Sequence, residues 1–284
     1  MNGSPLTRPA LRWQGGKWLL APWILEHFPA HRIYVEPFGG APSVLLRKGR
    51  AYSEVYNDLD AEVVTMFRVL RDRDQAERLR ELLQLTPYAR AEFESAYEPS
   101  DDPLETARRL IVRSFMGFGS DGHNPAVNTG FRANVTRSGT TPAHDWVNYA
   151  EALPALVDRL QGVVIECRDA LKVMQDRDGP DTLHYVDPPY LPETRSPKSR
   201  KSGAAYHAYK REMTYADHRS MLAAVKKLKG MVILSGYRSP LYDRSLKRWH
   251  LVERRAMADG ARERIEALWL NPLAAANQPQ PKFL

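Results

Sequence analysis

The most informative segment of this sequence is TLHYVDPPY, residues 182–190. Its first five residues, up to Val186, are mostly apolar and predict a short strand. Two consecutive prolines follow shortly after, and because neither has an N–H to donate to a neighbouring strand, the strand must end before them. The chain therefore leaves the sheet rigidly, with the Asp187 carboxylate facing outward and the aromatic side chain of Tyr190 close behind it in sequence.

Such a turn suits a planar base that carries an exocyclic amine. Hydrogen bonds to the Asp187 side chain and the Pro188 carbonyl would hold both amine hydrogens and favour a tetrahedral nitrogen as a bond to a methyl group forms. A flat ring would stack on Tyr190. A strand-terminating turn is the alternative, but the order strand, acid, two prolines and aromatic favours catalysis. We predict the catalytic residues Asp187, Pro188, Pro189 and Tyr190.

A second strand and turn lie near the N-terminus, in VEPFGG, residues 35–40. We predict a strand over 32–35, a helix over 43–47 and another strand over 51–56. This order of elements is a β-α-β unit, so the first part of the chain and the segment around 182–190 are expected to contribute parallel strands to one sheet.

The glycine turn and the acid that ends the next strand indicate a nucleoside cofactor. Gly39 and Gly40 would let a ligand approach the backbone, and Asp58 lies nineteen positions after Gly39. An acid at this spacing is placed to accept hydrogen bonds from ribose hydroxyls. The three-glycine fingerprint of dinucleotide-binding proteins is absent, so nothing here would hold a pyrophosphate. For the two glycines alone, a tight turn without a ligand is the alternative.

Two further segments are candidates for the same ligand. WQGGK, residues 13–17, has glycines that would admit a ligand, a lysine that could neutralise a carboxylate and a tryptophan that could cover a sulfonium group. Asp169 follows a predicted strand and could bind the adenine or the ribose of a cofactor. The alternatives are a helix-entry turn for the first segment and a helix N-cap for Asp169.

Strands and helices alternate over most of the chain. Further strands are predicted over 163–166, 182–186 and 231–234 and near 250–254 and 265–270, and further helices over 17–28, 61–70, 149–160, 170–175 and 216–227. This alternation predicts an α/β fold with a doubly wound sheet, whose ligands bind at the carboxyl ends of the strands.

The stretch 71–149 departs from this alternation. It begins with charged helical segments over 74–84, 87–97 and 104–116 and continues as a long loop rich in Gly, Asn, Thr and Ser. We predict an inserted, mainly helical domain there, with residues 1–70 and 150–284 forming the other domain.

The composition is that of a folded protein with a basic surface. The chain has 284 residues, 43% of them hydrophobic and 26% charged, which excludes a disordered chain. Its 41 Lys and Arg against 34 Asp and Glu leave a net charge of +7, so a polyanionic partner is expected. The eight histidines lack metal-ligand spacing, and no metal site is predicted. No apolar stretch reaches the ~20 residues of a membrane span, and neither membrane insertion nor secretion is expected.

The single cysteine, Cys167, excludes an internal disulfide and a cysteine-rich zinc site, which favours a cytoplasmic location. Because Cys167 ends a predicted apolar strand, we expect a small core residue there. Methylation at cytosine C5 needs a cysteine nucleophile, so that reaction is not favoured.

The motifs above, together with Asn57-Asp58, SGY at 235–237 and EALWLNP at 266–272, resemble in their order the Dam-like family of DNA adenine methyltransferases. The resemblance implies a sheet of the Rossmann-like class I methyltransferase type and an inserted target-recognition domain. It also implies S-adenosyl-L-methionine as the cofactor, no metal, and methyl transfer to the N6 amine of an adenine flipped out of double-stranded DNA.

The same resemblance assigns site residues by their position in these motifs. The cofactor residues are then Trp13, Gly15, Gly16, Lys17, Glu36, Pro37, Phe38, Gly39, Gly40, Asp58, Asp169 and Asp187. The inserted domain lacks the pattern expected of enzymes that methylate GATC, so the target sequence stays open.

Two basic stretches are candidates for the DNA-facing surface. Residues 108–137 contain five arginines and a single acid, and residues 195–201 follow the catalytic turn closely enough to close over a flipped nucleotide. Arginine reads guanine and asparagine reads adenine in the major groove, while other basic residues contact phosphate. The alternatives are a solvated helix face and a solvated loop. The predicted DNA-binding residues are Arg113, Asn124, Asn128, Arg132, Asn134, Arg137, Arg195, Lys198, Arg200 and Lys201.

Several other activities remain open at this stage. The exocyclic amine of cytosine and adenine in RNA would fit the same catalytic turn, and a DNA-binding protein that has lost its chemistry could keep the fold. Glutamine of a protein is less favoured, because enzymes of that kind typically carry Asn where this chain has Asp187. The sequence leaves the oligomeric state open and slightly favours a monomer.

Overall fold

The computed structural model describes residues 6–120, 122, 124–125, 129–133, 140–194, 212–258 and 262–279. The chain divides into two compact units. The first, here called the helical unit, comprises Met1–Trp18, Gly40–Arg47 and Asp60–Ile165, and the second, the sheet unit, comprises Leu19–Gly39, Lys48–Leu59 and Glu166–Leu284. These units cut the chain at other points than the predicted boundaries near 71 and 149, and the assignment of 71–149 to target recognition stays a prediction.

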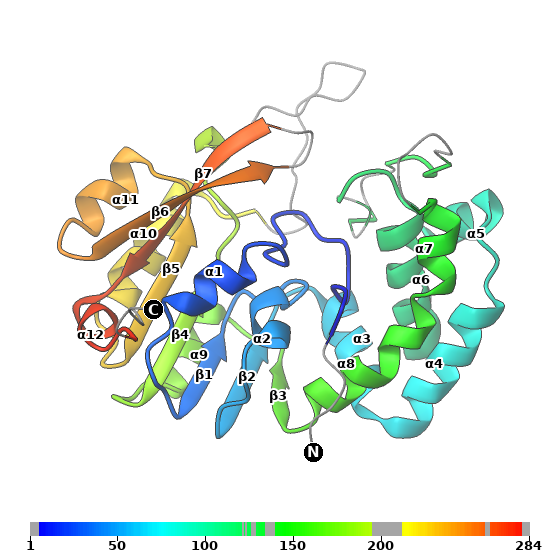
Figure 1. Ribbon diagram of the computed structural model, residues 1–284, viewed down its shortest axis with the longest axis horizontal. Coiled ribbons are helices and arrows are strands. Elements are labelled where there is room, and N and C mark those ends of the chain that lie inside the picture. The colour runs from blue at the N-terminus through cyan, green and yellow to red at the C-terminus, as the bar shows by residue number, and fades with distance from the viewer. Residues whose placement is uncertain are drawn as a thin grey trace, which may run out of the picture. The chain divides into compact units, whose positions relative to one another are not determined.

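One mixed sheet runs through the fold, in the strand order β3-β2-β1-β4-β5-β7-β6 (Figure 1). The strands are β1 (Ile33–Glu36), β2 (Ser53–Asn57), β3 (Val163–Glu166), β4 (Thr182–Val186), β5 (Met231–Gly236), β6 (His250–Ala258) and β7 (Arg262–Leu270). β2, β1, β4 and β5 pair in parallel, and β7 is antiparallel to both β5 and β6. The α/β fold class is therefore confirmed, and β3 and β4 have the bounds predicted for them.

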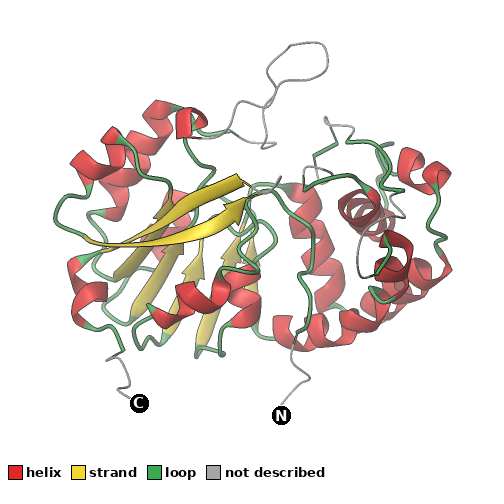
Figure 2. Cartoon of the chain, turned by 45° about the horizontal axis from the view of Figure 1, so that its top comes forward, coloured by secondary structure: helices red, strands yellow, loops and turns green. Residues whose placement is uncertain are grey.

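The central strands are apolar because both of their faces are covered. Every residue of β4 and of β5 is buried, the pattern of parallel strands with elements packed on each side. Val232 and Leu234 of β5 share one core cluster with Met221 and Leu222 of α10 (Tyr215–Val225) and with Trp269. β6 and β7 are the longest strands, with nine residues each, and Figure 2 shows them as a long antiparallel pair.

The helices of the sheet unit include two that the sequence does not predict. Its helices are α1 (Ala21–Glu26), α9 (Ala170–Asp176), α10, α11 (Pro240–Ser245) and α12 (Pro272–Ala276), with a 3-10 turn η2 (Pro192–Thr194). α11 and α12 have six and five residues, too few to show an amphipathic repeat. Each begins with a proline preceded by an N-cap, since the Ser239 side chain accepts from the Tyr242 N–H and the Asn271 side chain accepts from the Ala274 N–H.

The helical unit is built on amphipathic helices with acidic caps. It contains α2 (Ser43–Arg47), α3 (Ala61–Arg71), α4 (Arg73–Leu85), α5 (Arg90–Ser95), α6 (Pro103–Met116), α7 (Pro142–Val147), η1 (Ala150–Ala152) and α8 (Leu153–Leu160). Side chains of Asp60, Asp72 and Asp102 accept N–H groups at the starts of α3, α4 and α6. α3 packs against α6 through apolar faces. The helices predicted over 61–70, 74–84 and 104–116 are confirmed as α3, α4 and α6, to within one residue at each end. α7 is not predicted, because its six residues lie within a loop-like sequence.

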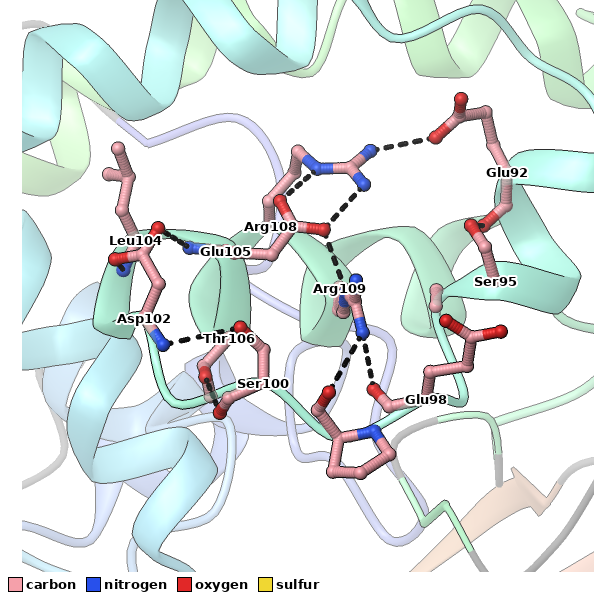
Figure 3. A network of polar contacts seen from close by, with 12 residues as sticks. Glu92, Ser95, Glu98, Ser100, Asp102, Leu104, Glu105, Thr106, Arg108 and Arg109 are labelled. Carbon is pink, nitrogen blue, oxygen red and sulfur yellow. Dashed lines mark hydrogen bonds and ion pairs between the residues drawn. The ribbon is translucent and has the colours of Figure 1, made fainter.

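Arginines of α6 form ion pairs with acids and hydrogen bonds with backbone carbonyls of the same unit (Figure 3). The Arg108 guanidinium donates to both carboxylate oxygens of Glu105 at 2.7 Å and to Glu92 at 2.9 Å. Arg109 donates to Glu105 at 2.7 Å and to the Glu98 carbonyl at 2.6 Å. Hydrogen bonds from Arg108, ahead of those from Arg109, hold the pKa of Glu105 below its ordinary value. These contacts hold α5 and α6 together.

Arg113 is the most deeply buried of these arginines, with 1% of its surface exposed. It donates to the Ala96 carbonyl at 2.5 Å and pairs with Glu62 of α3 at 2.9 Å. Its predicted contact with DNA is therefore wrong, because a side chain enclosed between helices does not reach a phosphate. The 3.6-residue period of α6 places Arg113 on the face that packs against α3.

The expectation for Cys167 is also wrong. Cys167 is exposed, because β3 ends at Glu166 and Cys167 lies in the short connection to α9. Within the described part of the chain, no helix is both long and apolar enough to span a membrane.

We expect Arg113→Ala to destabilise the protein by about 2–4 kcal/mol, because it leaves the Glu62 carboxylate and the Ala96 carbonyl without their buried partner. Urea unfolding measures this change. Arg78→Ala, which removes an ion pair to Glu81 with both side chains more than half exposed, is the control and should stay within about 0.5 kcal/mol. Equal stabilities for the two variants would contradict a structural role for Arg113.

We expect the stability of the protein to fall as the pH is lowered from about 6.5 to about 4, in part through His184. Burial inside β4 lowers the pKa of His184 to about 4, against a weaker opposing effect of Asp178 at 3.4 Å. The unfolded chain therefore binds the extra proton in this window, which weakens folding by up to ~3 kcal/mol. Urea unfolding at pH 7 and pH 4.5 should show a smaller pH dependence in His184→Gln. An unchanged dependence would contradict this assignment.

Candidate active site

The predicted catalytic turn follows β4 at the carboxyl edge of the sheet. Asp187 is half-buried, Pro188 is buried, and Tyr190 is 7% exposed. β4 pairs in parallel with β5 up to Val186 opposite Leu234, so the turn emerges beside Ser235 and Gly236. β1 and β2 end at the same edge, which brings Glu36 and Asp58 to the side of the sheet that carries Asp187.

The Tyr190 side chain is fixed by hydrogen bonds at its hydroxyl. Its O–H donates to Glu266 Oε2 at 2.9 Å, and its oxygen lies 3.0 Å from Ser235 Oγ. A phenol has one hydrogen, and Glu266 takes it, so Ser235 must be the donor in the second contact. The Tyr190 ring also meets Tyr237 edge-on, with 4.7 Å between centroids. Burial, followed by the charges of Asp187 and Glu266, raises the pKa of Tyr190 well above its ordinary value, so the phenol stays protonated.

Three carboxylates gather around the neighbouring Tyr185 at this edge. The pKa of Tyr185 is raised well above its ordinary value, first by burial and then, among charged neighbours, by Asp187, Glu36 and Glu266. Glu36 also accepts the Tyr34 hydroxyl at 2.7 Å. The edge therefore holds three carboxylates, which suits a ligand that carries positive charge and hydroxyl groups.

The turn after β1 is held by packing as well as by the backbone. A Cβ at Gly39 would lie 2.0 Å from Cε2 of the Tyr56 ring, so no other residue fits there. The Gly39 N–H donates to the Asn57 carbonyl at 2.8 Å, and the Asn57 amide donates to the carbonyls of Pro37 at 2.9 Å and Arg168 at 3.0 Å. Asn57 thereby ties together the chain segments that follow β1, β2 and β3.

In the helical unit, Trp13 covers Gly40. Gly40 has a φ of +47°, and a Cβ there would lie 2.7 Å from the Trp13 indole nitrogen. Lys17 is 5% exposed, and its ammonium donates to the Gly15 carbonyl at 2.7 Å. Gly15 itself has a φ of +72°, and the Gly16 N–H donates to the Trp13 carbonyl at 3.0 Å. The predicted segment 13–17 is thus a compact turn whose lysine is held close to its own backbone.

Asp58 and Asp169 are the residues predicted to bind the ribose or the adenine of the cofactor. Asp58 is half-buried directly after β2, and its backbone N–H donates to the Glu166 carbonyl at 3.4 Å. Asp169 is exposed and accepts the Lys172 N–H at 3.0 Å as the N-cap of α9. The N-cap alternative for Asp169 is therefore observed. Contact of either carboxylate with a cofactor stays a prediction, as it does for Pro37 and Phe38 in the turn after β1.

The predicted DNA-binding residues fall into two groups. Asn124 and Arg132 are 4% and 8% exposed, and Arg132 lies 3.6 Å from Asp145. Arg132 also lines a hollow of about 640 Å³ in the helical unit, together with Arg8 and Arg12. Both side chains are largely buried, and their contact with bases stays a prediction. The others, apart from Arg113, lie outside the described residues, and they are Asn128, Asn134, Arg137, Arg195, Lys198, Arg200 and Lys201.

Three polar residues of this edge are absent from the predicted site: Asn57, Ser235 and Glu266. All three are buried, at 0%, 2% and 7% exposure. The signal that could have found them is their place in motifs that carry the family resemblance, namely Asn57-Asp58, 235–237 and 266–272. Among the residues that the structure describes, no group of three or more His, Cys, Asp or Glu side chains could hold a metal ion.

The chain is similar in sequence to known DNA adenine methyltransferases. The family model of D12 class N6 adenine-specific DNA methyltransferases matches residues 13–258. The chain is 26% identical to the DNA adenine methylase of Escherichia coli (strain K12) over 190 residues, which is 65% of this chain and 66%, just under two thirds, of that protein. It is 24% identical to the DNA adenine methylase of Salmonella typhi over 218 residues, 76% of this chain and 75% of that protein.

The family model covers both glycine-containing turns, the predicted catalytic turn after β4 and most of the helical unit. The resemblance that the motifs indicate is therefore confirmed. This chain belongs to the family of D12 class N6 adenine-specific DNA methyltransferases.

Proposed function

We propose that this protein transfers a methyl group from S-adenosyl-L-methionine to the N6 amine of an adenine in double-stranded DNA. The observation that carries the proposal is the pairing of a half-buried Asp187 with a Tyr190 ring fixed by its hydroxyl, directly after a parallel strand. Family membership and the names of the relatives support adenine as the base.

The catalytic turn supplies acceptors for the amine. The Asp187 carboxylate and the Pro188 carbonyl accept the two N–H groups of the amine, and this orients its lone pair toward the incoming methyl group. As the amine nitrogen bonds to the methyl carbon and the carbon–sulfur bond breaks, positive charge would develop on the amine, and the Asp187 carboxylate would stabilise it until one N–H proton is released to water. Tyr190 provides a flat face for the base, and base stacking of this kind is worth ~1–3 kcal/mol.

The carboxyl edge of the sheet suits the cofactor chemically. S-adenosyl-L-methionine supplies an electrophilic methyl group on a cationic sulfur. Glu36, Asp187 and Glu266 are three carboxylates at this edge, which favours a cation, and Asp58 after β2 is the proposed acceptor for ribose hydroxyls. Lys17 and Trp13 are the proposed contacts for the carboxylate and the sulfonium group of the cofactor.

Double-stranded DNA as the substrate fits the net charge of +7. The adenine amine is hidden in a duplex, so the base must leave the stack at a cost of a few kcal/mol, which stacking on Tyr190 offsets in part. Arg108, Arg109 and Arg113 are engaged inside the helical unit, so the positive surface for DNA must come from other basic residues. The predicted stretch 195–201 is the proposed phosphate contact.

We expect Asp187→Ala to lower the rate of methyl transfer to DNA by at least ~10²-fold, because the amine loses its charged acceptor. The assay measures labelled methyl groups transferred from the cofactor to genomic duplex DNA, followed by nucleoside analysis. Wild-type protein should produce N6-methyladenine. Asp176→Ala, which removes an exposed ion pair to Arg168 at the end of α9, is the matched control and should keep full activity.

The same assay separates the rival activities. N4-methylcytosine as the product, or transfer to RNA in preference to duplex DNA, would overturn the proposal. An absence of any transfer by wild-type protein that still binds DNA would indicate a non-catalytic DNA-binding protein. A fully active Asp187→Ala variant would refute the role of the catalytic turn.

A further inference from the structure

We propose that Glu266 is a positioning residue that holds the Tyr190 ring in the orientation needed to stack on the target base. The Glu266 carboxylate does so by accepting the phenol hydrogen of Tyr190, and Ser235 completes the contact by donating to the phenol oxygen. This inference rests on the proposed function, since it names what aligns the stacking ring of that same site.

The three side chains come from three separate segments that the sheet brings together. Tyr190 follows β4, Ser235 lies near the end of β5, and Glu266 lies in β7. The antiparallel pairing of β5 with β7 sets Gly236 opposite Ala267, which places Glu266 just beyond the end of β5. The oxygen–oxygen distances are 2.9 Å from Tyr190 to Glu266 and 3.0 Å from Tyr190 to Ser235.

A buried carboxylate at this position needs an explanation beyond packing. Glu266 is 7% exposed, and burying a carboxylate costs desolvation free energy that its hydrogen bonds must offset. A carboxylate is retained where a strong acceptor is required, and the acceptor here is directed at the phenol of Tyr190.

The acceptor acts on the ring in two ways. It fixes the direction of the ring axis, because the phenol oxygen is held in place, while the edge-on contact with Tyr237 restricts rotation of the ring about that axis. It also polarises the phenol, since a hydrogen shared with a carboxylate makes the ring more electron-rich. An electron-rich face beside the amine stabilises the positive charge that develops there during transfer. The contact therefore contributes more in the transition state than in substrate binding, and its loss should lower kcat more than it raises KM.

The test uses the full-length protein with four changes: Glu266→Gln, Tyr190→Phe, their combination, and Glu253→Gln as the matched control. Gln keeps the size of Glu but is a weaker acceptor, and Phe keeps the ring but lacks the hydroxyl. Glu253 lies in the neighbouring strand β6, where it pairs with Ala267 across the sheet, and its side chain is 38% exposed.

We expect Glu266→Gln to lower kcat for methyl transfer by ~10-fold with less than a ~3-fold change in the KM values for DNA and cofactor. Tyr190→Phe should show the same loss, and the combined variant should lose no more than Tyr190→Phe alone, because both changes remove one contact. Glu253→Gln should match wild-type protein. Full activity of Glu266→Gln or of Tyr190→Phe, or losses that multiply in the combined variant, would overturn the inference.

A second measurement follows the ring without depending on activity. In protein labelled with fluorotyrosine, the ¹⁹F resonance of Tyr190 is identified as the one absent from Tyr190→Phe. Glu266→Gln should shift or broaden that resonance, and Glu253→Gln should leave it unchanged. A Tyr190 resonance that Glu266→Gln does not alter would overturn the inference. If wild-type protein transfers no methyl group while the resonance responds as expected, the proposed function fails and the positioning contact stands.

Discussion

Two prolines that cannot donate hydrogen bonds end β4 beside β5, and the polar edge of the sheet unit depends on this constraint. Parallel pairing then brings the ends of β1, β2, β4 and β5 to one side, where backbone groups no longer bond to a neighbouring strand. Polar residues lie at or directly after these ends: Glu36, Asn57, Asp58, Asp187 and Ser235. The residues proposed for methyl transfer therefore gather at an edge that the strand order itself creates.

The segments at this edge are held by internal contacts. Asn57 ties the segments after three strands, Tyr56 fills the space at Gly39, and Glu266 anchors Tyr190. Each contact removes conformational freedom before any ligand arrives, so less entropy is lost when substrates bind. Packing alone requires glycine at both positions of the turn after β1, because a side chain at Gly39 would collide with Tyr56 and one at Gly40 would collide with Trp13. This requirement is separate from the approach of a ligand that the motif indicates.

Hydrophobic periodicity and proline chemistry predict most of this fold. The bounds of β3, β4 and α2 are as predicted, and the long helices α3, α4 and α6 differ by at most one residue at each end. α7, α11 and α12 are missed because five or six residues carry no repeat, and only their capping residues and prolines indicate them. Side-chain partners across the fold are harder to predict. The burial of Arg113 depends on α3 packing against α6, and the contact of Glu266 depends on the β5–β7 register.

The decisive measurement is a crystal structure of the protein with duplex DNA and an unreactive analogue of S-adenosyl-L-methionine. We predict an adenine outside the base stack with its ring on Tyr190 and its amino nitrogen ~3 Å from the Asp187 carboxylate, facing the sulfur of the analogue. A target base bound elsewhere, or Asp187 turned away from both the amine and the sulfur, would contradict this arrangement.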